Sequence, residues 1–170
     1  MRRITILVGL AFMLAAAILV VSPDALADEI SLLQAIEKVE SETKMLVVQA
    51  AVAGNCYQVV VIGEGKTKNF NVDRATGKVE LSREKDWSEK SEKIAAAAKV
   101  PCSKAAADAL NECKGELRSV KVSLGNDGSV EFHVFVRTEA KGNMMAKVCA
   151  ASGKVGTVEP TEGAPTEGCE

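Results

Sequence analysis

The chain contains five cysteines, which are its residues best suited to covalent chemistry. In an oxidising compartment cysteines form disulfides, and an odd number leaves at least one thiol unpaired or intermolecular. Cys102 and Cys113 bracket one predicted helix, so eleven residues of helix hold them roughly 16 Å apart. A disulfide spans at most roughly 7 Å between α-carbons, so we expect no bond between these two. Cys169, in the predicted tail, is the candidate for a free or intermolecular thiol.

The single histidine, His133, is the residue on which general-base or metal chemistry would depend. No Cys, Asp or second His lies near it at a metal-ligand spacing, and the chain has no C-x-x-C motif. No G-x-S-x-G, phosphate loop or dinucleotide fingerprint is present either. We therefore expect no catalytic residues, no metal site and no cofactor, and interpret the protein as non-enzymatic.

A short phrase of the sequence occurs twice. Asn71–Val79 reads NVDRATGKV and returns, with a spacing of roughly 75 residues, as Lys147–Val155, KVCAASGKV. Its carboxylates do not alternate as an EF-hand requires. The phrase instead predicts a tight turn, in which an aspartate bonds downstream backbone amides and a glycine supplies a positive φ. The candidate turn residues are Asp73, Thr76, Gly77 and, in the second copy, Gly153.

Each copy of the turn follows one helical segment and a series of alternating apolar runs. In the first copy, Ser31 and Gln34 form a capping-box pattern that begins a helix ending near Thr43. Strands are expected at 45–52, 56–62, 68–72 and 78–81. In the second copy, a helix is expected at 102–113 and strands at 116–124, 129–138, 143–150 and 154–158.

The repeat therefore predicts an α+β fold of two tandem units. Each unit would be a helix packed on a small antiparallel sheet of three or four strands. A charged and alanine-rich segment, 83–100, would form a helix connecting unit 28–82 to unit 101–159, and the tail 160–170 would be disordered.

The N-terminal segment 1–27 has the pattern of a secretory signal peptide. Basic residues at Arg2 and Arg3 precede an uncharged run from Ile4 to Val21, and Ala25-Leu26-Ala27 supplies a small-x-small cleavage site. We expect an exported, periplasmic or secreted bacterial protein, which would be membrane-bound only if this segment is kept as an anchor.

The first copy resembles a PepSY domain over about residues 28–82. The resemblance rests on Ile30-Ser31-Leu32 with Ala35-Ile36, on Tyr57-Gln58-Val59-Val60-Val61, and on Val72-Asp73 with Thr76-Gly77-Lys78-Val79. The second copy, about 100–159, resembles a degenerate repeat, with Cys149 in place of the motif aspartate and Ser152 in place of the threonine. The resemblance implies a binding or regulatory role, associated with peptidase propeptides and protease inhibition, and no catalytic residues.

Strand alternation divides each sheet into a helix-facing and an outward face. Val130, Phe132, Val134 and Val136 would meet one helix, and Tyr57, Val59 and Val61 the other. The outward positions then include Val60, Ile62 and Phe135. These three are surface apolar residues, a partner-binding surface, or, in our preferred interpretation, the interface on which the two units pack. In that arrangement Cys56 and Cys149, which also point outward, are a candidate disulfide.

Charge and composition limit the class of partner. The net charge is −2, acidic and basic residues are interspersed, and the chain has only one Trp, one Tyr and four Phe, which argues against nucleic acid. We expect a protein or peptide partner, with an envelope or secreted peptidase as one candidate that the protein would inhibit or modulate. The alternative is a structural envelope protein acting through self-association.

Overall fold

The computed structural model describes residues 29–162, a range that contains three helices and eight strands. The predicted signal peptide, most of the predicted tail and Cys169 lie outside the described residues. The elements are α1 Leu32–Thr43, β1 Leu46–Ala53, β2 Cys56–Gly63, β3 Lys66–Asp73, β4 Val79–Asp86, α2 Glu89–Ala97, α3 Cys102–Cys113, β5 Glu116–Leu124, β6 Val130–Thr138, β7 Gly142–Cys149 and β8 Val155–Pro160.

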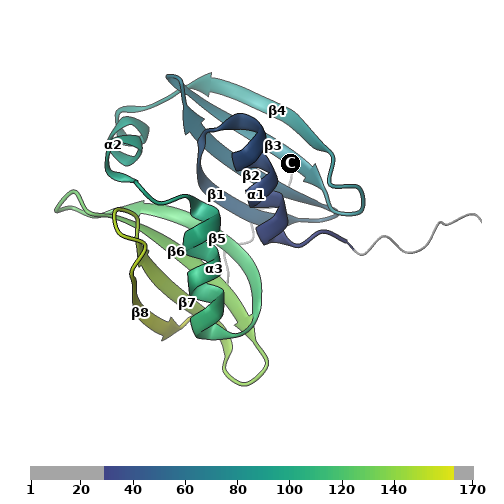
Figure 1. Cartoon of the computed structure of the whole chain (residues 1–170), viewed down its shortest axis with the longest axis vertical. Helices are drawn as coiled ribbons and strands as arrows, with labels where there is room; N and C mark the ends of the chain where they lie inside the picture. Colours follow the sequence, from purple (N-terminus) through teal and green to yellow (C-terminus); the bar gives the residue numbers. More distant parts are fainter. Residues whose placement is uncertain (1–28, 163–170) are drawn as a thin grey trace, which may run out of the picture.

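The eight strands form one antiparallel sheet in the order β4-β3-β2-β1-β5-β6-β7-β8 (Figure 1). The predicted fold, two tandem units each with its own small sheet, is therefore wrong. The first strands of the two halves pair with each other, through Gln49–Lys121, Ala50–Val120 and Ala51–Ser119. A strand at the edge of a four-stranded sheet presents unpaired backbone groups, and joining two such edges satisfies them. We call residues 32–86 the N-terminal half and residues 102–160 the C-terminal half.

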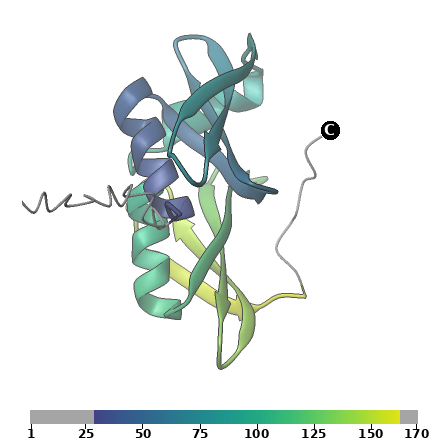
Figure 2. The same cartoon turned by 90° about the vertical axis from the view of Figure 1, so that its right-hand side faces the viewer.

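Helices α1 and α3 cover the same face of the sheet and contact each other (Figure 2). Beneath them, Ala50 pairs with Val59 in the N-terminal half, and Val120 pairs with Val134 in the C-terminal half. All four are fully buried. The hydrophobic core is thus continuous across the β1–β5 pairing, which is why the halves form one body.

Helix α1 begins at the predicted capping box, which the structure confirms. The Ser31 hydroxyl accepts a hydrogen bond from the Gln34 amide at 3.2 Å, and the Gln34 side chain accepts one from the Ser31 amide at 2.7 Å. The helix ends where Lys44 adopts a left-handed conformation with φ of 57°. Both ends of α1 are therefore fixed by local backbone chemistry.

Helix α3 buries smaller side chains than α1 does. Its buried positions are Cys102, Ala105, Ala106 and Ala109, whereas α1 buries Leu32, Ala35, Ile36 and Val39. The C-terminal half compensates with Phe132, the largest fully buried side chain. The predicted inward alternation of Val130, Phe132, Val134 and Val136 is confirmed, since all four are buried. The large side chain on the sheet thus fills space that the small buried side chains of α3 leave.

Candidate functional site

The two halves are related by an approximate twofold arrangement. The buried positions of α1 recur in α3 at a spacing of 70 residues: Leu32, Ala35, Ile36 and Val39 correspond to Cys102, Ala105, Ala106 and Ala109. The antiparallel pairing of β1 with β5 relates the two halves of the sheet in the same way. Such an arrangement creates two equivalent junctions between the halves, one at the start of α3 and one at the start of α1.

The junction at the start of α3 is closed by Glu40 from α1. The N-cap residue of α3 is Pro101, which offers no side-chain acceptor. One carboxylate oxygen of Glu40 accepts from the Cys102 amide at 2.8 Å, and the other accepts from the Ser103 hydroxyl at 2.5 Å. The N-terminal half therefore supplies the anionic cap that α3 lacks, at the helix end where a negative charge is favoured.

Helix α2 fills the rest of this closed junction. It begins at the N-cap Ser88 and contacts both β2 and β5. Its Ile94 is only 6% exposed and belongs to the same buried cluster as Ile62. Trp87, Ala95, Ala97 and Ala98 pack against that cluster. At the junction at the start of α3, Glu40 therefore caps the helix and α2 fills the remaining space.

Among residues 29–162, nothing fills the junction at the start of α1, which we call the open junction. At the spacing of 70 residues, the position equivalent to Glu40 is Leu110, which cannot accept a hydrogen bond. A groove of about 1440 Å³ lies here. Its wall is built by the start of α1, the end of α3, the strand ends of β1, β2, β5 and β6, and the β6–β7 hairpin. The lining residues include Leu32, Leu33, Val52, Tyr57, Arg74, Leu110, Cys113, Lys114, Gly115, Glu116, Leu117, Arg118, Arg137, Thr138 and Lys141.

The groove combines an apolar floor with a charged rim. Leu33, Val52, Leu110 and Cys113 line it and are each half-buried. Burial raises the pKa of the Cys113 thiol, and the nearby Glu112 adds to that effect. This thiol therefore stays protonated and contributes to the floor as a small apolar group.

Three cations on the rim have no ion-pair partner within residues 29–162. They are Lys114, Arg137 and Lys141, and two unpaired carboxylates, Glu112 and Glu139, also line the groove. The described lining thus holds more unpaired positive than negative charge. An apolar floor beneath unpaired cations suits a segment that carries both aliphatic and acidic side chains.

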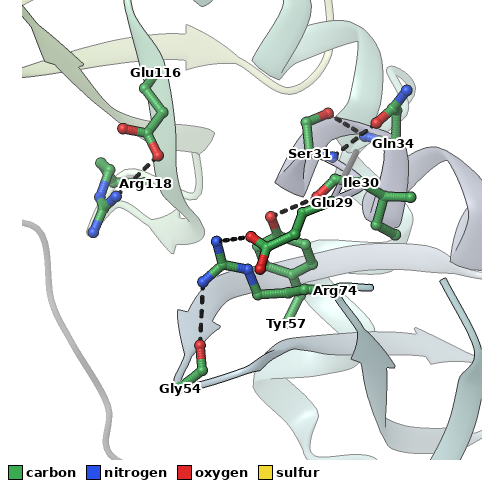
Figure 3. A network of polar contacts seen from close by, with 9 residues as sticks. All are labelled: Glu29, Ile30, Ser31, Gln34, Gly54, Tyr57, Arg74, Glu116 and Arg118. Carbon is green, nitrogen blue, oxygen red and sulfur yellow. Dashed lines mark hydrogen bonds and ion pairs between the residues drawn. The ribbon is translucent and has the colours of Figure 1, made fainter. Parts of the chain in front are cut away.

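Arg74 forms the wall of the groove on the side of the N-terminal half (Figure 3). Its guanidinium donates to the Glu29 carboxylate at 2.5 Å and to the Gly54 carbonyl at 3.2 Å. It also lies 5.5 Å from the centre of the Tyr57 ring, and the Tyr57 hydroxyl donates to the Ile30 carbonyl at 2.7 Å. The network fixes the segment that leads into α1.

The opposite wall carries a second, separate ion pair. Arg118 lies 3.0 Å from Glu116 on β5, and Figure 3 shows this pair separate from the Arg74 network. The buried Nε of Arg74 has no hydrogen-bond partner among the described residues. The two walls are therefore each braced within their own half, and no ion pair between residues 29–162 joins them.

The first copy of the repeated turn contains Arg74 and so supplies this wall of the groove. Asp73 accepts from the Thr76 amide and hydroxyl, both at 2.7 Å, and these bonds hold the pKa of Asp73 below its usual value. Gly77 has a φ of 67°, and its carbonyl accepts from Lys38 of α1 at 2.7 Å. The backbone of Arg74 also binds Ile30. The turn thus attaches α1 to the sheet and directs Arg74 into the groove.

The second copy of the turn carries a thiol where the first carries a carboxylate. Gly153 has a φ of 74°, and its amide donates to the Cys149 carbonyl at 2.8 Å. A hydrogen bond from the Ser152 side chain, with backbone amides of Ala151 and Ser152, lowers the pKa of Cys149. The thiol therefore takes the place of the Asp73 carboxylate as the acceptor of this turn.

The outward residues do not form an interface between the halves. The halves join edge to edge, so Val60 and Phe135 lie half-buried on the same face of one sheet, opposite α1 and α3, which we call the far face. Ile62 is 2% exposed and belongs to the core cluster that includes Ile94 of α2. The preferred interpretation, in which these three residues form the interface between two packed units, is therefore wrong, because the halves join through the pairing of β1 with β5.

The proposed disulfide between Cys56 and Cys149 is also ruled out within one chain. Cys56 begins β2 and Cys149 ends β7, with β1, β5 and β6 between them. Four strand spacings separate the two by about 19 Å, well beyond the reach of a disulfide.

His133 lies on the far face, 3.7 Å from Glu131.

Several residues that build the groove were missed by sequence reasoning. Leu110, Arg137 and Lys141, like Glu40 at the closed junction, stand among other charged or apolar residues, and none belongs to a recognisable motif. Arg74 lies within the repeated phrase, which predicted a turn and not a wall of a groove. The one available signal was the spacing of 70 residues between the helices, which puts Glu40 against Leu110. This spacing shows that the two copies differ at this position, a glutamate in one and a leucine in the other. The difference indicates a groove only when the β1–β5 pairing is known.

Within the described range, no helix is long and apolar enough to cross a bilayer, and no group of three or more His, Cys, Asp or Glu side chains could hold a metal ion.

Comparisons with known proteins place the chain in no family. No family model matches the sequence, and no curated protein matches it. Among solved structures, a candidate lipoprotein of Clostridium difficile 630 is similar, with 16% identity and a TM-score of 0.45 over 77% of this chain and 93% of that one. Similarity at this level supports no inference about fold or function.

Proposed function

We propose that the protein is an exported, non-catalytic binding protein that holds a short segment of a partner protein in the open groove. The observation that supports this is the junction at the start of α1, where an apolar floor lies beneath Lys114, Arg137 and Lys141. The equivalent junction is capped by Glu40 and filled by α2. Export rests on the signal-peptide pattern of residues 1–27.

The partner segment is acidic and aliphatic. Its carboxylates would meet the three rim cations, and its aliphatic side chains would cover Leu33, Val52 and Leu110. Burial of these half-exposed side chains would supply affinity, whereas the rim charges would set the choice of partner. The resemblance of residues 28–82 to PepSY domains adds a peptidase, inhibited or modulated through such contacts, as the first class of partner to test.

The test is a binding assay with a labelled synthetic peptide rich in glutamate and leucine, measured by fluorescence anisotropy on the chain beginning at Asp28. Lys114→Glu and Lys141→Glu should each weaken binding about fivefold, the effect of roughly 1 kcal/mol. Lys121→Glu makes the same charge change at an exposed position on the far face and should leave binding unchanged. Equal effects of all three variants would contradict binding in the groove.

Self-association is the second candidate function. Leu81 on β4 and Val158 on β8 are 53% and 39% exposed, and both lie on the outermost strands of the sheet. Pairing of two such edges would bury both side chains and extend the sheet from copy to copy. Sedimentation at increasing concentration tests this, and a monomer throughout would reject it.

A further inference from the structure

The closed junction shows what fits between the two halves. Helix α2 lies there against β2 and β5, with Ile94 buried in the core and Ala95, Ala97 and Ala98 packed beside it. Only nine residues, Glu89–Ala97, form this helix. One aliphatic side chain and a row of alanines, with Trp87 just before the helix, are therefore enough to fill a junction of this kind.

The open groove is the equivalent of that position. The twofold arrangement exchanges β2 with β6 and β5 with β1, and the open groove is lined by Arg137 and Thr138 of β6 and by Val52 of β1. It also exchanges the end of α1 with the end of α3, which contributes Leu110 and Cys113. Each element that borders α2 thus has its counterpart around the groove.

The counterpart of α2 itself would stand before α1. Helix α2 precedes α3 by a short connection, Ala98 to Pro101, whereas the described residues before α1 are Glu29, Ile30 and Ser31 alone. Within residues 29–162, no helix occupies the groove. Because Leu110 replaces Glu40, the floor of the groove is also more apolar than the closed junction.

From this equivalence we infer that the open groove binds a short amphipathic helix of the partner protein, anchored by one aliphatic side chain in the position that Ile94 has at the closed junction. The inference rests on the proposed function and specifies its ligand. Acidic residues on the helix face Lys114, Arg137 and Lys141, and small residues beside the anchor allow close approach to α1 and α3. A helix binds in this mode through side chains spaced three or four residues apart.

The test grafts the helix that already fills the equivalent position. Residues 87–98 are copied and placed directly before Glu29, so that the copy stands at the same sequence distance from α1 as α2 does from α3. The matched control is the same graft with the copied Ile94 replaced by aspartate. Linkage makes even a weak contact measurable, because the effective concentration of a tethered segment is high.

Two measurements report occupancy of the groove. In urea unfolding, the isoleucine graft should lower the unfolding equilibrium constant at least roughly tenfold relative to the aspartate graft, since one aliphatic side chain is buried. Cys113, which lines the groove, should react more slowly with iodoacetamide in the isoleucine graft. The isoleucine graft should also compete with the acidic peptide.

The outcomes separate this inference from the proposed function. If both grafts unfold alike and leave Cys113 equally reactive, the helix inference is wrong. In that case charge-dependent peptide binding to the ungrafted chain still supports the proposed function, and its absence rejects both. If Cys113 is already protected in the chain that keeps residues 1–27, the chain's own N-terminal segment is the occupant, and the assignment to a partner is overturned.

Discussion

Replacing Glu40 by alanine should destabilise the protein by about 2 kcal/mol. The substitution removes the acceptor that binds the Cys102 amide at 2.8 Å and the Ser103 hydroxyl at 2.5 Å. Loss of a helix N-cap costs about 1 kcal/mol, and loss of a charge-assisted hydrogen bond to a partly buried hydroxyl adds about as much. Pro101 cannot compensate, because it has no side-chain acceptor.

The assay is urea unfolding of the chain beginning at Asp28, followed by far-ultraviolet circular dichroism. Glu37→Ala is the matched control, because Glu37 is exposed on the same helix and forms no ion pair with the described residues. Glu40→Gln keeps an acceptor without the charge and should cost about half as much as Glu40→Ala. In the Glu40→Ala background, Pro101→Ser should restore about 1 kcal/mol by supplying a local cap.

The result that would refute this reasoning is a Glu40→Ala variant whose stability lies within about 0.5 kcal/mol of Glu37→Ala, the range of ordinary surface substitutions. The carboxylate would then be incidental to the junction. The contrast between a closed and an open junction would lose its physical basis.

Three further substitutions or reactions test other parts of the structure. Gly115→Ala should destabilise the protein by about 1–3 kcal/mol, because a β-carbon there would lie 2.3 Å from the Arg137 carbonyl oxygen; thermal unfolding measures the loss. Cys149 should be alkylated faster than an ordinary thiol at neutral pH, since hydrogen bonding lowers its pKa, and Ser152→Ala should slow the reaction. Asp73 should titrate below its usual pKa in an NMR pH series, and Thr76→Val should move the midpoint upward. Because the folded state lowers this pKa, the stabilisation is present above the unfolded value near 3.8 and is lost as pH falls through the folded value.

The first two of these expectations each have a control. Gly156→Ala places a β-carbon 3.5 Å from its nearest neighbour and should be tolerated. The fully buried Cys102, whose pKa is raised by burial, should resist alkylation in the folded protein. Equal alkylation of Cys102 and Cys149, or a tolerated Gly115→Ala, would contradict the geometry of α3 and of the second turn.

Sequence reasoning was most successful where the signal was local. The capping box of Ser31 and Gln34 involves residues three apart, and the alternation from Val130 to Val136 follows directly from strand geometry. These features depend on a few neighbouring residues. They therefore determine element positions without knowledge of the rest of the chain.

The arrangement of the halves was not predictable in the same way. It depends on the pairing of Ala50 with Val120, which are 70 residues apart in sequence. Both lie in apolar strands that would serve equally well as edges of separate sheets. The groove was unpredictable for the same reason, because Leu110 indicates an uncapped junction only once it is known to occupy the position equivalent to Glu40.

The most direct test of the central claim is amide chemical-shift mapping of the chain beginning at Asp28, titrated with the glutamate- and leucine-rich peptide. Binding in the open groove predicts the largest shifts at Leu33, Leu110, Gly115 and Lys141. Largest shifts on the far face, around Val60 and Phe135, or no shifts at any peptide concentration, would contradict it.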